Sequence, residues 1–129
     1  MANVSSGIFG ESNLMNLKEI DFSQIRPEAS ALMLDNENPV AAFQTVRDQV
    51  VFTTHRVFVM NVQGITGKKV SYFSYPYSKV QYFGIETAGL IDIDSEMTLA
   101  FASGAKLTFD FKSKVDIKKI SALISGFIL

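Results

Sequence analysis

Apolar and polar residues alternate with a period of two through much of the chain after residue 39. Between residues 46 and 89 the alternation forms four consecutive runs separated by short polar turns, which predicts an antiparallel meander. In the run 57–62, Phe58 and Met60 fall on one face, and Val57 and Val59 fall on the other. Because both faces are apolar, we expect one to line a closed barrel and the other to meet a helix, an arm or another subunit.

The same pattern predicts a mainly β fold with seven strands. They are expected at residues 40–46, 49–54, 57–62, 68–75, 79–86, 96–102 and 106–111. Their connections are short, and Ser103-Gly104 before the last strand is a hairpin signal.

The period changes after residue 112. Ser113 is a candidate N-cap with Asp116 at its third position, which predicts a helix that runs to the end of the chain. Its apolar stripe consists of Ile117, Ile120, Leu123, Ile124, Phe127 and Ile128. Burial of such a stripe contributes on the order of 10 kcal/mol before entropy is subtracted, so this helix should form part of the core. We expect the apolar end at Leu129 to lie against the sheet or a neighbouring chain.

The N-terminal part predicts helices instead. Leu14, Leu17 and Ile20 recur at intervals of three, and Pro27 suits the first turn of a second helix. We therefore expect residues 1–34 to form an arm with one or two short helices over 12–34, and residues 35–129 to form the main domain.

Charge separates these two parts. Up to Thr45 there are six acids and two bases, a net of −4, whereas the remainder has ten bases and seven acids, a net of +3. Arm and body are either independently solvated or attract one another, within one chain or between neighbours. Neither net charge approaches the basic excess of a nucleic-acid-binding protein.

Composition excludes several classes of protein. The chain has no cysteine, which excludes disulfides and thiolate catalysis. No apolar run has the roughly 18 to 20 residues that span a bilayer, and the first ten residues lack the basic start of a secretory signal. These features predict a cytoplasmic protein.

Several short phrases occur in an order that resembles the bacterial pleckstrin homology (PH) domain family. They are Val46-Arg47-Asp48, Val51-Phe52-Thr53, His55-Arg56, Gln63-Gly64-Ile65-Thr66-Gly67-Lys68-Lys69, Tyr75-Pro76-Tyr77 and Glu86-Thr87-Ala88-Gly89. The resemblance covers about residues 35–129. It implies a PH-like barrel of seven antiparallel strands in two nearly orthogonal sheets, capped by the C-terminal helix. It also implies self-association into ring-like homo-oligomers, and it implies no reaction.

The sequence departs from phosphoinositide-binding PH domains at one loop. Those domains resemble each other in a basic loop between their first two strands. Here that connection is Arg47-Asp48-Gln49, which is too short to wrap a headgroup and pairs its one base with an acid. The departure argues against phosphoinositide binding by that route.

Three polar motifs have both a structural and a functional interpretation. Residues 64–69 lack the spacing of a phosphate-binding loop and favour a turn, although Arg47, Arg56, Lys68 and Lys69 remain candidate contacts for an anion. Asp92, Asp94 and Glu96 alternate as in a calcium loop but lack its glycine and its last glutamate. His55 is the only histidine, which leaves few partners for a zinc site or a catalytic triad. No motif calls for a metal or a cofactor.

Aromatic residues are dense between positions 72 and 83. They can serve core packing, a subunit interface, or stacking with a ligand. The candidate interface residues are Tyr72, Tyr75, Tyr77, Phe127 and Leu129.

These observations favour a non-enzymatic protein-interaction module that binds copies of itself through exposed edge strands. The alternative is binding of an anionic ligand or a membrane surface through Arg47, Arg56, Lys68 and Lys69. A single histidine, no cysteine and no convincing acid pair argue against an enzyme.

Overall fold

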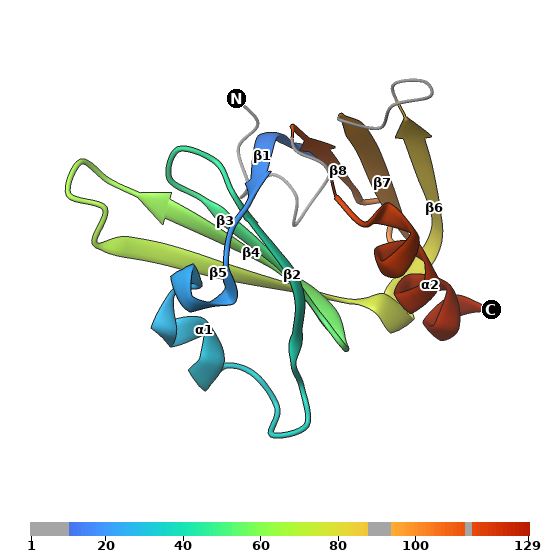
Figure 1. Cartoon of the computed structure of the whole chain (residues 1–129), viewed down its shortest axis with the longest axis horizontal. Coiled ribbons are helices and arrows are strands. Elements are labelled where there is room, and N and C mark those ends of the chain that lie inside the picture. The colour runs from blue at the N-terminus through green and yellow to red at the C-terminus, as the bar shows by residue number, and fades with distance from the viewer. Residues whose placement is uncertain (1–10, 88–93, 113–114) are drawn as a thin grey trace.

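The computed structural model describes residues 11–87, 94–112 and 115–129. Eight strands form one strongly bent sheet in the order β5-β4-β3-β2-β1-β8-β7-β6 (Figure 1). The strands are β1 (Glu11–Glu19), β2 (Pro39–Gln44), β3 (Gln49–Thr53), β4 (Arg56–Gln63), β5 (Lys69–Pro76), β6 (Val80–Thr87), β7 (Ser95–Phe101) and β8 (Lys106–Phe111). The seven predicted strands are confirmed as β2 to β8, and β1 is an eighth that was not predicted.

β1 corrects the prediction of a helix at the start of residues 12–34. Leu14 and Leu17 are both buried, although residues three apart point to opposite faces of a regular strand. The register of β1 against β8 shifts between these two leucines, and Asn16 between them has φ 59°. This bulge inserts an extra residue, so both leucines reach the core at a spacing that resembles a helical turn.

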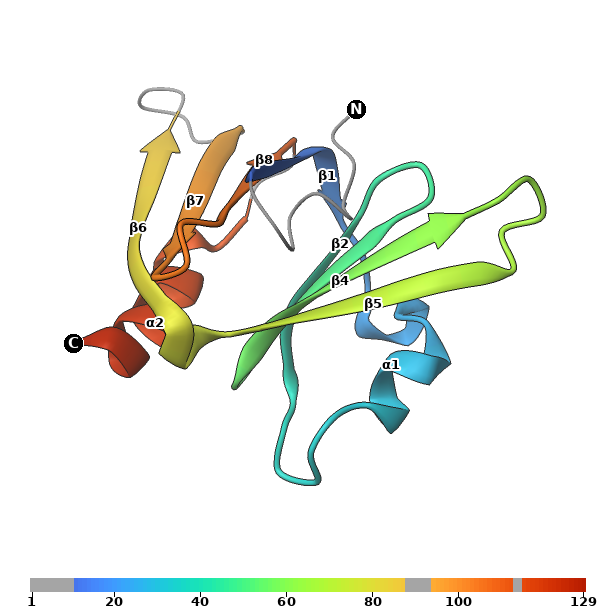
Figure 2. The same cartoon turned by 180° about the vertical axis from the view of Figure 1, so that it is seen from behind.

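β1 also joins the two halves of the sheet. Its end pairs antiparallel with β2 at Lys18 and Glu19, while its start pairs parallel with β8 from Glu11 against Lys106. The parallel pairing departs from the purely antiparallel arrangement that the sequence predicted. Strands β2–β5 and β6–β8 thus diverge from a shared strand that lies N-terminal to residue 34, as Figure 2 shows from behind.

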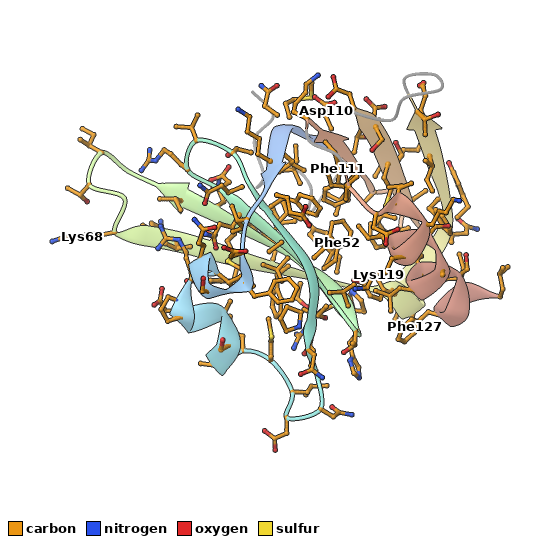
Figure 3. The ribbon with its side chains drawn as sticks, in the orientation of Figure 1. Phe52, Lys68, Asp110, Phe111, Lys119 and Phe127 are labelled. Atoms are coloured by element: carbon orange, nitrogen blue, oxygen red, sulfur yellow. The ribbon has the colours of Figure 1, made fainter. Side chains whose placement is uncertain are left out.

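The main core fills the concave side of the bend. Its largest buried side chains are aromatic, and the Phe43 and Phe111 rings lie 4.7 Å apart, with Phe52 and Phe109 at 5.3 Å. Phe52 and Phe111 come from opposite halves of the sheet and meet in the interior (Figure 3). Contacts between these aromatic rings add to the stabilisation that burial of each ring provides.

The helix α2 (Ile117–Ile128) packs on this core beside β6 and the 3-10 turn η3 (Tyr77–Lys79). Its N-cap is Asp116, whose Oδ1 accepts from Lys119 N at 3.1 Å. The helix therefore begins later than predicted, and Ser113 lies outside the described residues. Most of the predicted apolar stripe faces the core. Ile120 and Ile124 are fully buried and Ile117, Leu123 and Ile128 pack against the core, whereas Phe127 is exposed.

A second, smaller cluster lies on the opposite face of β2–β5. It consists of Ala29, Ala42, Val51, Phe58 and Met60. The segment 20–38, with η2 (Phe22–Gln24) and α1 (Pro27–Ala31), covers this cluster, and we call it the strap. Pro27 occupies the first turn of α1 as predicted. None of the described helices has the length and apolar character needed to cross a membrane.

Candidate functional site

The turns at the ends of two hairpins lie side by side. They are residues 45–48, between β2 and β3, and residues 64–68, between β4 and β5; we call them the hairpin tips. The Arg47 guanidinium donates to the Gly64 carbonyl and links the two turns. Gly64 and Gly67 have φ values of 81° and 68°, which confirms the turn predicted for this segment. Strands flank the turn on both sides, unlike a phosphate-binding loop.

A polar cleft of 700 Å³ runs between the hairpin tips and the strap. Arg47 lines it from one side and Arg26 from the other. Gln49 fixes the strap here, because its Oε1 accepts from Arg26 N at 3.0 Å and its Nε2 donates to Gln24 O at 2.9 Å. Arg26 was not among the predicted contacts. Its only local signal is its position directly before Pro27, at the start of α1.

A more enclosed and more apolar cavity of 870 Å³ adjoins the cleft and extends to β1. Leu14, Met15 and Ile20 supply its apolar wall. Asp48 also lines it, yet this residue is buried and its carboxylate accepts from Val62 N at 2.9 Å and from the Asn61 amide. Asp48 therefore fixes the β2–β3 turn onto β4.

The predicted anion contacts divide into two groups. Arg47, Lys68 and Lys69 all lie on or beside the hairpin tips and are exposed, with Lys68 at the far end of the molecule (Figure 3). Arg56 is separate from them. It forms a two-contact ion pair with Glu37, with Nη2 2.7 Å from Oε1 and Nε 2.8 Å from Oε2.

The other contacts of Arg56 are structural as well. It donates to Leu32 O at 2.8 Å and to Ser74 Oγ at 3.1 Å, and it stacks over the Phe58 ring at 4.3 Å. Because all three guanidinium nitrogens of Arg56 already donate to protein groups, Arg56 anchors the strap and is not available to bind an anion.

The carboxyl of Glu37 responds to this environment. Desolvation alone would raise its pKa, but hydrogen bonds from Arg56, Thr53 and the Leu34 amide, together with the Arg56 charge, lower that pKa from 4.5 to about 2. The hydrogen bond to Glu37 also raises the pKa of the Arg56 guanidinium. Both groups remain charged at neutral pH.

The candidate interface residues lie in different environments. Tyr77 belongs to the core, since it is fully buried and its hydroxyl donates to Thr53 O at 2.8 Å. Burial raises its pKa. Tyr72 is half-buried and donates to Glu28 of the strap at 3.3 Å, and Tyr75 packs against the Phe101 ring at 5.5 Å.

At the end of α2, 43% of Phe127 and 99% of Leu129 are exposed. His55 is adjacent, with its ring 6.5 Å from the Phe127 ring and its Nδ1 2.9 Å from Thr54 Oγ1. This arrangement fits a structural role for the histidine.

The described residues of the acidic motif, Asp94 and Glu96, do not form a group that could bind a metal ion. Asp94 and Asp110 flank Lys112 at 3.8 Å and 3.5 Å, and Asp92 lies outside the described residues. No group of acidic or histidine side chains within the described ranges has an arrangement that could hold a metal ion.

Both ends of the sheet are exposed edges in the described part of the chain. β5 pairs only with β4, and β6 pairs only with β7. On β6, 53% of Tyr82 and 38% of Ile85 are exposed, and Glu86 is its only charged residue. A long edge strand with so little charge is a template for pairing with another chain.

Comparison with known families assigns this architecture. The family model described as "Bacterial PH domain" matches residues 8–128. The chain belongs to the bacterial PH domain family. The family match includes β1, which is part of the sheet.

Relatives of this bacterial PH domain share its length. The uncharacterized protein YjqA of Bacillus subtilis is 38% identical over 122 residues, covering 90% of this chain and 97% of that protein. The uncharacterized protein YozO of the same organism is 25% identical over 119 residues, covering 92% of this chain and 95% of that protein.

Solved structures agree with the fold. A DUF1696 family protein with a pleckstrin-homology domain from Shewanella loihica is similar at a TM-score of 0.72 and 36% identity, over 89% of this chain and 99% of that one. A pleckstrin homology domain from Shewanella amazonensis is similar at a TM-score of 0.59 and 34% identity, over 98% of this chain and 99% of that one.

Proposed function

We propose that this bacterial PH domain is a non-enzymatic interaction module that assembles with copies of itself through its exposed sheet edges. One observation carries the proposal. β6 is eight residues long, exposed along most of its length, and bounded on one side by no other described strand. Its unpaired backbone groups and its apolar side chains Tyr82 and Ile85 suit addition of a strand from another copy.

The presence of a second edge, β5, determines which symmetries the assembly can have. β5 lies at the opposite end of the sheet, so a β6 edge that pairs with a β5 edge makes a head-to-tail contact. Head-to-tail contacts close into rings when the rotation between copies permits it, whereas pairing of two β6 edges gives a dimer with two-fold symmetry. The exposed Phe127 beside the β6 end of the molecule extends the apolar surface of such a contact.

Native mass spectrometry and light scattering at tens of micromolar test the proposal. The wild-type protein is expected as an oligomer. The double substitution Tyr82→Lys and Ile85→Lys places charge on the edge and is expected to yield monomers. Leu34→Lys is the matched control, because it adds a lysine at a 56% exposed apolar position on the strap.

A monomeric wild-type protein would end the proposal. So would an oligomer that persists unchanged in the β6 variant while the variant remains folded by circular dichroism.

A further inference from the structure

The strap covers an apolar face of the sheet but buries few of its own side chains. Each residue of the second apolar cluster, which lies between the strap and β2–β5, is at most 1% exposed. Among residues 20–38 of the strap, only Ala29 and Glu37 are buried. Its helical turns η2 and α1 have three and five residues, and helices this short are not stable alone. The position of the strap therefore depends on its attachments to the sheet.

The backbone of the strap is joined to the rest of the chain only at its two ends. Ile20 N donates to Ala42 O at 2.9 Å, and Thr54 N donates to Asn38 O at 2.9 Å. In the described chain, every backbone-to-backbone hydrogen bond of residues 21–37 stays within the strap. No strand pairing would therefore be broken if the strap moved away from the sheet between these two ends.

Polar side chains of β3, β4 and β5 attach the strap between its ends. Gln49 of β3 bonds to two backbone groups of the strap, at 3.0 Å and 2.9 Å. Arg56 of β4 holds both Glu37 and a backbone carbonyl of the strap, at 2.7 Å and 2.8 Å. Tyr72 of β5 donates to Glu28 at 3.3 Å. The contact of Arg56 with Glu37 is the only ion pair among these attachments, so it is the main one.

We propose that the strap is a displaceable cover that opens as one unit about its fixed ends while the sheet and the main core stay folded. Arg56 is the latch that keeps it closed. Opening uncovers Val51, Phe58 and Met60 and separates Arg56 from its carboxylate. The open state thus differs from the closed one by an apolar face bordered by a positive charge, and a partner can favour the open state only through this difference.

The main core keeps its own cover when the strap opens. Figure 1 shows α1 of the strap and α2 on opposite sides of β2–β5, and α2 packs on the main core. Segments with few buried apolar contacts open at a lower free energy than the core to which they are attached. The attachments named above come from β2–β5 and the turn after β3, so the inference does not depend on assembly through β6.

The reactivity of buried thiols tests the inference in the full chain. The chain has no cysteine, so a single introduced cysteine is a unique reporter. Val50 and Val51 are neighbours on β3 and both are 0% exposed, but Val50 belongs to the main core and Val51 to the cluster beneath the strap. Val50→Cys and Val51→Cys are therefore a matched pair. Their reaction with a chromogenic aromatic disulfide is followed at increasing urea concentrations below the unfolding transition.

We expect Val51→Cys to react about tenfold faster than Val50→Cys, or more, in the absence of urea. Its rate should hardly change at low urea, because opening of the strap exposes little surface and sensitivity to urea scales with the surface exposed. Val50→Cys should react only through global unfolding, with a rate that rises steeply with urea. Ala42→Cys and Ala41→Cys on β2 are a second pair for the same two faces, and the same order is expected.

The latch is tested by adding Glu37→Gln to Val51→Cys. We expect the rate at low urea to rise about tenfold or more, because the amide cannot replace the carboxylate that Arg56 holds. Asp35→Asn is the matched control, since it removes an exposed carboxylate from the same strap. It is expected to leave the rate unchanged. Circular dichroism checks that each variant is folded.

Two results would overturn the inference. Val51→Cys and Val50→Cys could react at the same rate and with the same dependence on urea, which would show that the strap leaves the sheet only on global unfolding. The rate of Val51→Cys could also stay unchanged when Glu37→Gln is added, which would show that Arg56 is not the latch.

Discussion

Arg56 and Glu37 face each other in a two-contact ion pair that joins β4 to the end of the strap. The Nη2 to Oε1 distance is 2.7 Å, and the Glu37 side chain has no exposed surface. The partners lie 19 residues apart in the sequence, across the loop and the two strands that lead from the strap to β4. A carboxylate buried in this way depends on its cation, because removal of one partner leaves the other charge without compensation.

Glu37→Gln is therefore expected to lower the free energy of unfolding by about 3 kcal/mol, mainly because Arg56 would be left without its carboxylate partner. Urea denaturation at neutral pH measures the effect. Glu28→Gln is the control, because Glu28 is exposed and accepts only a long bond from Tyr72, at 3.3 Å. Equal stability of Glu37→Gln and the wild type would contradict the structural role of this pair.

The same pair predicts a pH dependence. The folded-state pKa of Glu37 is about 2, whereas the ordinary value for the unfolded chain is 4.5. The contribution of Glu37 to the free energy of unfolding is therefore fully present above pH 4.5 and is lost as pH falls from 4.5 towards 2. The shift corresponds to about 3 kcal/mol. The stability difference between the wild type and Glu37→Gln should therefore shrink across that range. A difference that stays constant down to pH 2 would show that proton binding at Glu37 is not linked to folding.

Tyr77→Phe removes one buried hydroxyl from the core. The ring can keep its packing against Phe127, at 5.5 Å between centroids, but Thr53 O loses the donor that lies at 2.8 Å. We expect a destabilisation of about 1 to 2 kcal/mol, which thermal unfolding measures. Tyr82→Phe, at an exposed position, should leave the melting temperature within error. A stabilised Tyr77→Phe would mean that this hydrogen bond contributes nothing.

Two glycines predict opposite responses to alanine. Gly104 has φ 95° in the β7–β8 turn, and no atom lies within 4 Å of a Cβ there, so Gly104→Ala isolates backbone strain and should cost about 1 kcal/mol. Gly126 lies in α2, also with open space around a Cβ. Gly126→Ala should stabilise the protein by about 0.5 to 1 kcal/mol. Chemical denaturation of both variants checks the signs, and a destabilised Gly126→Ala would indicate a contact at that helix surface in an assembly.

Asn16 tests the bulge in β1. Its φ of 59° is tolerated by asparagine and glycine but is costly for a β-branched side chain. Asn16→Gly should be nearly neutral, whereas Asn16→Val should cost about 1 to 2 kcal/mol. The pair of variants is compared by thermal unfolding. Equal stability of the two would show that the bulge relaxes without strain.

The regular part of the fold could be predicted from the sequence because its elements have local signals. β7 and β8 alternate between apolar and polar residues, β2 to β6 are runs of β-branched and aromatic residues bounded by turn residues, and α2 has a clear stripe of period 3.6. The β1 strand could not be found in this way, because one extra residue at Asn16 converts a period of two into the Leu14 to Leu17 spacing of three. The asparagine between two leucines is the local signal, since it is among the few residues that accept a positive φ.

The candidate site was predictable only in part, for a different reason. The turns that carry Arg47, Lys68 and Lys69 lie at the same end of the sheet, because alternate turns of an antiparallel meander face the same way. The basic character of those turns is visible in the printed chain. The role of Arg56 depends on Glu37, which lies 19 residues earlier in the chain and has no local sequence pattern that links it to an arginine. Arg26 enters the cleft only because Gln49 holds the strap onto β3. Such pairings are long-range and have no local pattern.

The parallel ladder between β1 and β8 has a consequence for how the protein is made. Glu11 pairs with Lys106, so during synthesis β1 must wait until the chain has been extended as far as β8 before the backbone groups on this side of β1 are paired. During synthesis the nascent chain would display an apolar ribbon, with Leu14 and Leu17 still uncovered. Such a delay favours escort by a chaperone and makes late stalling of translation more damaging than in a protein whose neighbours in space are also neighbours in sequence.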